Sequence, residues 1–199
     1  MVHIMQHFFR ELRSVKLMGI SLLLIFSVSC RKSNYEVSEG TVTVRDNGEG
    51  TGTLTWTSEQ DYLLEGFVFV NDGQVLTIEA GTVIRSKTGQ GASASALIVA
   101  RGGKIIARGT SSEPIIFTVE DDDLQGSVPV DAQGLWGGLI LLGRAPLNLS
   151  AGEAHIEGIP LTEPRGVYGG IDPDDDSGVL QYVSIRHAGT NIGEGNEIN

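Results

Sequence analysis

The stretch ALIVARGGKIIARGTSSEPIIFT, residues 96–118, decides the fold. It places two short apolar runs on either side of a charged break that contains glycine, and a third run, PIIFT, follows a few residues later. Short runs of this kind, rich in β-branched residues and bounded by turn residues, predict β-strands. Two architectures accommodate three such strands: a pair of hairpins in an ordinary sheet, or one part of a coil that repeats.

The same pattern continues along the chain from Gly40. No window carries apolar residues at helical spacing over three turns, and glycine interrupts the sequence almost every ten residues. The apolar material falls into short runs that we predict to be strands: residues 67–70, 75–78, 97–99, 104–107, 115–119, 139–142 and 179–185. The chain is therefore expected to be all-β over residues 40–199.

The spacing of these runs favours a repeat. Comparable runs contain Leu76, Leu97, Ile116, Leu139 and Leu180, with gaps of 21, 19, 23 and 41 between successive positions. The last gap is about twice the others, and HIEGIPL (residues 155–161) lies where a missing turn is expected. A period near 20 predicts a solenoid whose short strands stack into parallel ladders, because the rest of each circuit supplies the long crossover that parallel strands need. An antiparallel β-sandwich is the alternative.

Four segments resemble a known family. They are LTIEAGTVI (residues 76–84), LIVARGGKIIARGTSSEPIIFT (97–118), GLWGGLILLG (134–143) and LQYVSIRHAG (180–189). They resemble right-handed parallel β-helix proteins of the pectin-lyase-like fold, which are common as lipoproteins or secreted proteins of Bacteroidetes and related bacteria and are mostly uncharacterised. The resemblance covers roughly residues 62–190 and implies a right-handed parallel β-helix. It also implies an N-terminal fragment, an expectation supported by the ending GTNIGEGNEIN, which carries no apolar cap for an open last circuit.

In such a coil, alternate residues of each strand point inward and stack on their counterparts in the next circuit. We expect glycines at the corners, where the backbone needs φ > 0 or leaves no room for a Cβ: Gly81, Gly102, Gly103 and Gly109. Pro114 should begin a strand, where its missing N–H costs least. Trp136 is too large for most inner positions, so we expect it to cover an end or flank of the stack.

The segment 1–29 is predicted to be a signal peptide. Three basic residues precede a short apolar stretch, LMGISLLLIFSVS, which is too short for a membrane-spanning helix and typical of a signal peptide. The chain's single cysteine, Cys30, follows directly and resembles the lipidation site of a bacterial lipoprotein, although Ser27 stands where that family usually has Leu. A plain secretory peptide cut near Ser29 is the alternative. We expect a polar tether over residues 30–39 and an outer-membrane lipoprotein that faces the periplasm or the cell surface.

Charge and cysteine content exclude several classes of partner. Removal of residues 1–29 takes away three of 14 basic and one of 25 acidic residues, which leaves a net charge near −13. Nucleic acid is therefore not expected as a partner, since phosphate binding needs clustered Lys and Arg. The membrane contact is expected to come from acyl chains rather than from attraction to anionic lipid. With no cysteine after Cys30, neither a disulfide framework nor a thiolate metal site can form.

Two acidic clusters are candidate calcium sites, EDDDLQG (residues 120–126) and DPDDDSG (residues 172–178). Crowded carboxylates repel one another, and Ca²⁺ relieves this repulsion through several oxygen ligands. Asp172, Asp174 and Asp176 alternate as in an EF-hand loop, but Ser177 follows where that loop has Gly, and Val183 stands where it has its bidentate Glu. The cluster is therefore not an EF-hand, and a solvated acidic loop is the alternative to a calcium site.

The resemblance implies polysaccharide chemistry where such a fold is catalytic. Lyases of the fold use Ca²⁺ on acidic residues with an Arg or Lys base, and its hydrolases use close carboxylate pairs. Candidates in this chain are the carboxylates of residues 174–176 with Arg186 or His187, although His187 is more simply explained as a corner residue. No carboxylate pair recurs at the repeat period. The expected function is a non-catalytic, lipid-anchored β-helix that binds an extended glycan or an envelope protein. A lyase or hydrolase with its site partly beyond residue 199, and a purely structural or adhesive protein, are the alternatives.

Overall fold

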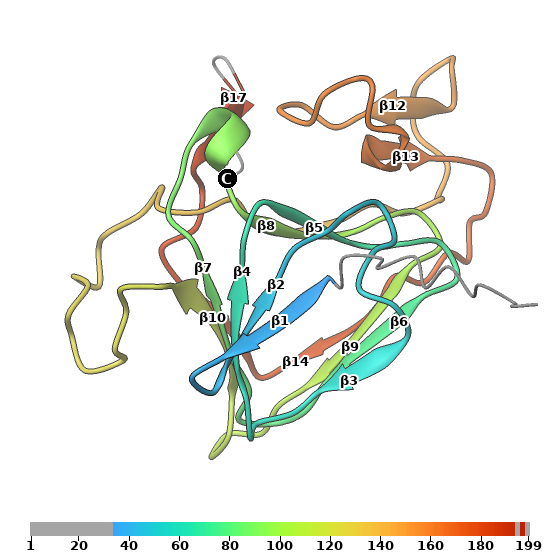
Figure 1. Cartoon of the computed structure of the whole chain (residues 1–199). Coiled ribbons are helices and arrows are strands. Elements are labelled where there is room, and N and C mark those ends of the chain that lie inside the picture. The colour runs from blue at the N-terminus through green and yellow to red at the C-terminus, as the bar shows by residue number, and fades with distance from the viewer. Residues whose placement is uncertain (1–33, 194–195, 198–199) are drawn as a thin grey trace, which may run out of the picture. The chain divides into compact units, whose positions relative to one another are not determined.

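The computed structural model describes residues 34–193 and 196–197, which form an almost all-β domain (Figure 1). Three sheets make up its body. The first, sheet A, has the order β1-β2-β4-β7-β10-β15, the second, sheet B, the order β14-β9-β6-β3, and the third, sheet C, the order β11-β8-β5. The expected signal peptide and Cys30 lie outside the described residues. Within them, no helix is long and apolar enough to span a membrane.

Each sheet is built from short strands. In sheet A they are β1 (Tyr35–Ser38), β2 (Thr41–Val44), β4 (Asp61–Leu64), β7 (Val83–Ser86), β10 (Ile115–Val119) and β15 (Val183–Ile185). Sheet B contains β3 (Leu54–Trp56), β6 (Val75–Ile78), β9 (Lys104–Arg108) and β14 (Gly178–Gln181). Sheet C contains β5 (Phe67–Val70), β8 (Ala96–Val99) and β11 (Gly138–Leu141). All seven runs predicted to be strands overlap strands, although Leu142 lies just beyond the end of β11. The last run is divided between β14 and β15 because the chain turns at Tyr182, whose φ is +48°.

The chain visits the sheets in a fixed order, B then A then C. It does so in β3-β4-β5, again in β6-β7-β8, and a third time in β9-β10-β11. Neighbours within each sheet are parallel, apart from β1 against β2. The segment 96–118 therefore contains β8, β9 and β10, one strand from each sheet, and is one circuit of a coil. Parallel pairing excludes both the hairpins and the antiparallel sandwich for these strands.

The sequence predicted circuits of equal length, near 20 residues, and this prediction is wrong. Paired positions in sheet B are Leu54 with Leu76, Leu76 with Ile105, and Ile105 with Gly178, so each circuit is longer than the one before it. The five leucine and isoleucine positions used for the period fall on different sheets, because short strands follow one another at a similar spacing around each circuit.

The missing turn expected at residues 155–161 is not a circuit either. It lies in a long excursion, residues 143–177, which carries the antiparallel strands β12 (Glu153–His155) and β13 (Val167–Gly169) and the 3₁₀ turn η2 (Pro164–Gly166). A second 3₁₀ turn, η1 (Gly91–Ser93), lies in the loop between β7 and β8, and the short pair β16 (Asn191–Gly193) and β17 (Asn196–Glu197) ends the described chain.

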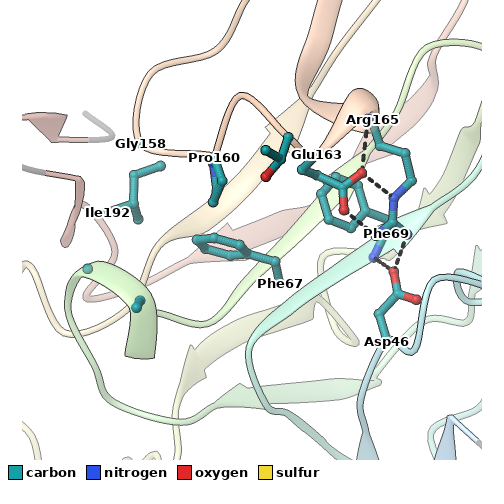
Figure 2. A pocket seen from close by; sticks show the side chains of 11 residues that line it. Asp46, Phe67, Phe69, Gly158, Pro160, Glu163, Arg165 and Ile192 are labelled. Atoms are coloured by element: carbon teal, nitrogen blue, oxygen red, sulfur yellow. Dashed lines mark hydrogen bonds and ion pairs between the residues drawn. The ribbon is translucent and has the colours of Figure 1, made fainter.

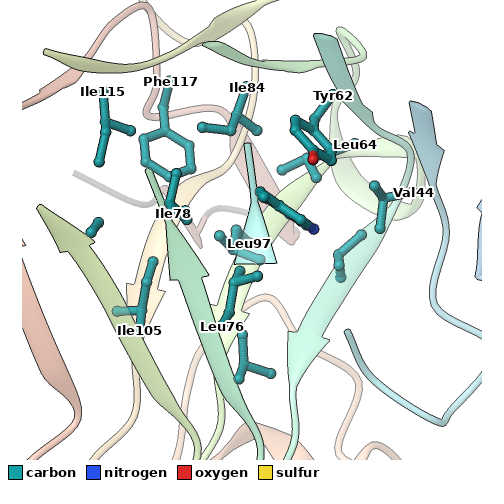
Figure 3. Packing of buried hydrophobic residues seen from close by; sticks show 14 of the residues in the cluster. Val44, Tyr62, Leu64, Leu76, Ile78, Ile84, Leu97, Ile105, Ile115 and Phe117 are labelled. Atoms are coloured by element: carbon teal, nitrogen blue, oxygen red, sulfur yellow. The ribbon is translucent and has the colours of Figure 1, made fainter. Parts of the chain in front are cut away.

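The inner faces of the sheets form the main core (Figure 3). The register places Tyr62, Ile84 and Phe117 one above another in sheet A, and Leu76 on Ile105 in sheet B. All five side chains are at most 5% exposed. Stacking of like apolar residues between circuits thus follows from the parallel register, as the sequence predicted.

Trp136 does not cover an end or flank, as its size had suggested. It is fully buried, stacks on Phe117 with ring centroids 6.5 Å apart, and donates from Nε1 to the Arg186 carbonyl oxygen at 2.7 Å. The interior accommodates an indole here because Trp136 enters the stack through a single bridge to Ala188 rather than from a regular strand.

Corner glycines and Pro114 lie as expected. Gly102 has φ +79°, and a Cβ at Gly103 would collide with the carbonyl oxygen of Val70. Pro114 directly precedes β10. The polar tether expected over residues 30–39 differs from the structure in its second half, since Tyr35–Ser38 forms β1 and pairs antiparallel with β2. Strand β1 thereby covers β2, the first strand of the parallel part of sheet A.

Sheet C is buried on both faces. Its inner face contributes Val68 and Leu97 to the main core, while Phe69, Ile98 and Ile140 align on its outer face and begin a second apolar cluster. Ile159 of the excursion is buried in this cluster. Double-sided burial explains why the runs FVFV and ALIV are continuously apolar rather than alternating.

Candidate functional site

A cleft of about 710 Å³ lies between the outer face of sheet C and the excursion (Figure 2). We call it the sheet C cleft. Its walls are Asp46, Phe67, Phe69, Gly91, Ala92, Gly158, Pro160, Thr162, Glu163, Arg165 and Ile192. This volume falls within the range of ligand sites in proteins, which is about 300–1,000 Å³.

Two aromatic residues from one strand form the floor. Phe67 and Phe69 stand two residues apart on β5, so the strand's alternation directs both to the outer face. Phe69 is 1% exposed, whereas Phe67 is only partly buried. The ring of Phe67 therefore supplies accessible apolar surface within the cleft.

Arg165 is the polar centre of the cleft. Its Nε and Nη2 donate to the two oxygens of Glu163 at 2.7 and 2.6 Å, and its Nη1 donates to Asp46 Oδ2 at 2.6 Å and to Asn71 Oδ1 at 3.2 Å. The guanidinium carbon lies 3.9 Å from the centre of the Phe69 ring. A planar guanidinium held by two carboxylates and an aromatic ring is fixed in orientation.

Local structure explains how Glu163 and Asp46 reach Arg165. Glu163 caps the short turn η2: its Oε1 accepts from the backbone N–H of Arg165 at 3.0 Å, with Pro164 in the first position of the turn. Asp46 follows β2, and its side chain is 1% exposed. The carboxylate of Asp46 also accepts from the backbone N–H groups of Gly48 and Phe69, at 2.7 and 3.2 Å.

The hydrogen bonds shift the ionisation of this cluster. Hydrogen bonds from Arg165 hold the pKa of Glu163 below its ordinary value of 4.5, against the opposing effect of burial. The same bonds raise the pKa of Arg165. At neutral pH Glu163 is therefore ionised beside a permanent cation, and it is poorly suited to act as a general acid, which needs a raised pKa.

The three aspartates proposed to bind calcium are not brought together as a metal site. Asp172 Oδ1 accepts from the backbone of Asp174, and Asp176 accepts from Gly178 N at 2.8 Å and pairs with Lys104 Nζ at 3.1 Å. Over residues 34–193, no group of three or more His, Asp or Glu side chains is arranged to hold a metal ion. The structure describes an internally hydrogen-bonded loop here, and calcium binding by this loop stays a prediction.

Arg186 and His187 lie elsewhere than with residues 174–176. They follow β15 and face Asp122 of the first acidic cluster, with Arg186 Nη1 and His187 Nε2 at 3.9 and 3.8 Å from Asp122 Oδ2. His187 has φ +58°, in agreement with its interpretation as a corner residue. Two residues that the sequence singled out thus face an acid far away in the chain, and among the described residues their ion pairs are with Asp122 and not with residues 174–176.

The residues of the sheet C cleft were not found from the sequence. Asp46, Glu163 and Arg165 lie in loops, where no periodicity marks them. One local signal was present: the order Glu-Pro-Arg-Gly at residues 163–166 is typical of a capped turn with Pro at its start. Their convergence depends on the excursion folding back over sheet C.

Comparison with known families agrees with the three parallel sheets. Residues 48–199 match the model of the pectate-lyase like beta helix domain, which covers about three quarters of the chain. No curated protein and no solved structure matches the chain at a significant level.

Proposed function

The chain belongs to the pectate-lyase-like beta helix family, and we propose that it binds an extended glycan in the sheet C cleft without cleaving it. A beta-helix domain of this type is compatible with glycan binding and with a lyase or hydrolase. The observation that carries the binding proposal is the partly exposed Phe67 ring beside the fixed guanidinium of Arg165, within one cleft.

Sugars present two chemical faces, and the cleft offers a partner for each. The C–H face of a pyranose packs against an aromatic ring through dispersion and loss of apolar surface to water. Phe67 provides that ring. Sugar hydroxyls need hydrogen-bonding groups held in place before binding, and Thr162 and the carboxylate of Glu163 line the opposite wall. A ligand in this cleft would meet one apolar and one polar wall.

A binding role is favoured over catalysis by the state of Glu163. Both of its oxygens accept hydrogen bonds from Arg165, and its pKa is lowered. Glycoside hydrolysis needs one carboxyl group that stays protonated near neutral pH. The cluster instead resembles a rigid recognition surface.

The proposal includes a cellular setting. Residues 1–29 would direct export, and acylation of Cys30 would anchor the domain in the cell envelope, most simply as an outer-membrane lipoprotein. Calcium is not required by this account. Cys30→Ala should move the protein from the membrane fraction to the soluble envelope fraction, and an unchanged distribution would contradict the anchor.

Glycan-array retention tests the binding proposal. We expect the full chain to be retained by one class of extended glycan, and Phe67→Ala to lose that retention. Tyr182→Asn is the matched control, because Tyr182 is an aromatic residue 56% exposed outside the cleft, and Asn tolerates its φ of +48°. Retention on no glycan would contradict the proposal.

The catalytic alternative has its own assay. The full chain is incubated with acidic and neutral polysaccharides, with and without calcium, and the products are examined for new reducing ends and unsaturated sugars. We expect neither. Appearance of either product that depends on Glu163 would replace the binding proposal with a lyase or a hydrolase.

A further inference from the structure

A second cleft, of about 580 Å³, lies where sheet A ends at β15. We call it the Asp122 cleft. It is lined by Asp122, Leu124, Gly126, Val128, Val130, Ser184, Ile185, Arg186 and His187. No residue lines both this cleft and the sheet C cleft.

Two polar side chains in its wall are more than nine-tenths buried. The side chains of Asp122 and His187 are 4% and 6% exposed. Asp122 Oδ2 accepts from Thr118 Oγ1 at 2.6 Å, and Oδ1 accepts from Leu124 N at 2.8 Å. Burial opposes ionisation of Asp122, but these hydrogen bonds, together with the nearby His187 and Arg186 side chains, lower its pKa, so the carboxylate is charged at neutral pH. A buried charge of this kind needs partners.

The hydrogen bonds of His187 define which ring nitrogen is free. Nδ1 lies 2.7 Å from the carbonyl oxygen of Ala132, which can only accept, so Nδ1 carries the proton and neutral His187 presents an unprotonated Nε2. That Nε2 lies 3.8 Å from Asp122 Oδ2, beyond hydrogen-bond distance. In this neutral tautomer, Nε2 is an acceptor that faces the Asp122 carboxylate across a gap.

Arg186 places donors beside the same gap. Its Nε donates to Ser184 Oγ at 3.2 Å, while its Nη1 stands 3.9 Å from Asp122 Oδ2, too far for a hydrogen bond. Seven of the nine Lys and Arg residues within residues 34–193 pair with a carboxylate at 3.1 Å or less; Arg186 and Arg108 do not. The η nitrogens of Arg186 are thus open to a ligand.

Two residues of this cleft have a strained backbone conformation. His187 and Leu124 have φ of +58° and +61°, and both line the cleft. Non-glycine residues rarely occupy this region, and where they do so the strain often serves a binding site. Trp136, which donates to the Arg186 carbonyl oxygen at 2.7 Å, holds the same segment from the core side.

We propose that the Asp122 cleft binds a vicinal diol of a neutral sugar. Two adjacent hydroxyl groups supply two O–H donors, one for Asp122 Oδ2 and one for His187 Nε2, and their oxygens accept from the η nitrogens of Arg186. A carboxylate or phosphate would face two acceptors and the charge of Asp122. A cation would face Arg186. A diol matches all three side chains, and the 3.9 Å between Arg186 Nη1 and Asp122 Oδ2 leaves room for a hydroxyl oxygen that accepts from the first and donates to the second.

The probes are a β-1,4-linked glucose hexamer, a β-1,4-linked mannose hexamer, the fully O-methylated glucose hexamer, and a galacturonate hexamer. The full chain is labelled with ¹⁵N-histidine and titrated with each. We expect the Nε2 resonance of His187 to move with at least one neutral hexamer and not with the methylated one, which has no O–H donors. His155 reports on the other cleft, since its Nε2 contacts the carbonyl oxygen of Glu163 in the wall of the sheet C cleft, so a shift of His155 alone would indicate binding there and not at the Asp122 cleft.

Variants separate this site from the rest of the molecule. Arg186→Gln should weaken binding of that hexamer roughly tenfold or more, the loss of a charge-assisted hydrogen bond. Arg108→Gln, the other arginine without a close carboxylate, should leave it unchanged. Phe67→Ala, which disables the sheet C cleft, should leave the His187 shift intact, so the two proposals can fail independently. Four results would overturn the proposal. In the titrations, they are an equal shift of the His187 resonance with the methylated hexamer, a shift with galacturonate alone, or no shift with either neutral hexamer. Among the variants, it is an equal loss of binding in Arg186→Gln and Arg108→Gln.

Discussion

Arg165 Nη1 donates to Asp46 Oδ2 at 2.6 Å, although the two residues are 119 positions apart in the sequence. This contact ties the excursion to the loop between β2 and β3. Two further ion pairs join the excursion to later loops of the coil, Arg144 with Asp72 at 2.7 Å and Arg101 with Glu153 at 2.5 Å. The wall of the sheet C cleft is therefore held by charged contacts rather than by backbone pairing.

The ion pair between Arg165 and Asp46 should contribute more to the free energy of unfolding than an ordinary surface ion pair. Arg165→Ala leaves the carboxylate of Asp46, 1% exposed, without its cation, and we expect a loss of roughly 2–3 kcal/mol in the free energy of unfolding. Arg45→Ala is the control: Arg45 is also held by two carboxylates, but is 46% exposed, and its loss should cost less than about 1 kcal/mol. Urea unfolding measures both, and equal losses would contradict the account.

Acid should loosen the same contact. Because the pKa of Glu163 is lowered in the folded protein, its ionisation stabilises the fold fully above the ordinary value of 4.5, and this contribution is lost as pH falls through the folded pKa. Wild type should therefore lose stability more steeply than Glu163→Gln below pH 4.5. Urea unfolding of both proteins across this range tests the sign. Parallel profiles would show that Glu163 does not contribute in this way.

The corner at residues 102–103 should be intolerant of side chains for a steric reason. A Cβ at Gly103 collides with the Val70 carbonyl oxygen, so Gly103→Ala must displace the backbone of a neighbouring circuit, at a cost of about 3 kcal/mol. Gly66→Ala is the matched control. Gly66 has φ +77° but open space around it, so alanine there meets only backbone strain of about 1 kcal/mol. Thermal unfolding should rank the two variants in that order.

Trp136 should be a main support of the last circuits. Trp136→Ala empties a fully buried position beside Phe117 and should cost about 3–5 kcal/mol. Trp136→Phe keeps most of the volume but leaves the Arg186 carbonyl oxygen without its donor, and should cost about 1–3 kcal/mol. If Trp136→Ala were as stable as wild type, Trp136 would not be a support of the core, and the account would be contradicted.

The strands could be predicted because each is marked by its own residues. The runs FVFV, ALIV and KIIAR are rich in apolar and β-branched residues and each is followed closely by a glycine, and these properties are local. The parallel stacking of the strands could also be predicted, since the inward-pointing residues of successive circuits, such as Leu76 and Ile105, are both large and aliphatic. The true length of each circuit could not be predicted from the sequence, because strands of the three sheets look alike in sequence and the loops between them vary freely in length.

The clefts could not be predicted for a different physical reason. Asp46 and Arg165 carry no pattern, and their pairing depends on where the long excursion (residues 143–177) folds back. The sequence marks Arg186, His187 and the acidic cluster that contains Asp122, but nothing in it indicates that these residues meet. The partner of Arg186 and His187 depends on which loop lies over β15, and that is a property of the tertiary structure.

The central claim is that the sheet C cleft binds glycan through Phe67. Its most direct test is a calorimetric titration of the glycan best retained on the array into wild type, Phe67→Ala and Tyr182→Asn. The account predicts a loss of affinity of roughly tenfold or more for Phe67→Ala, with Tyr182→Asn like wild type. Equal affinity in wild type and Phe67→Ala would contradict it.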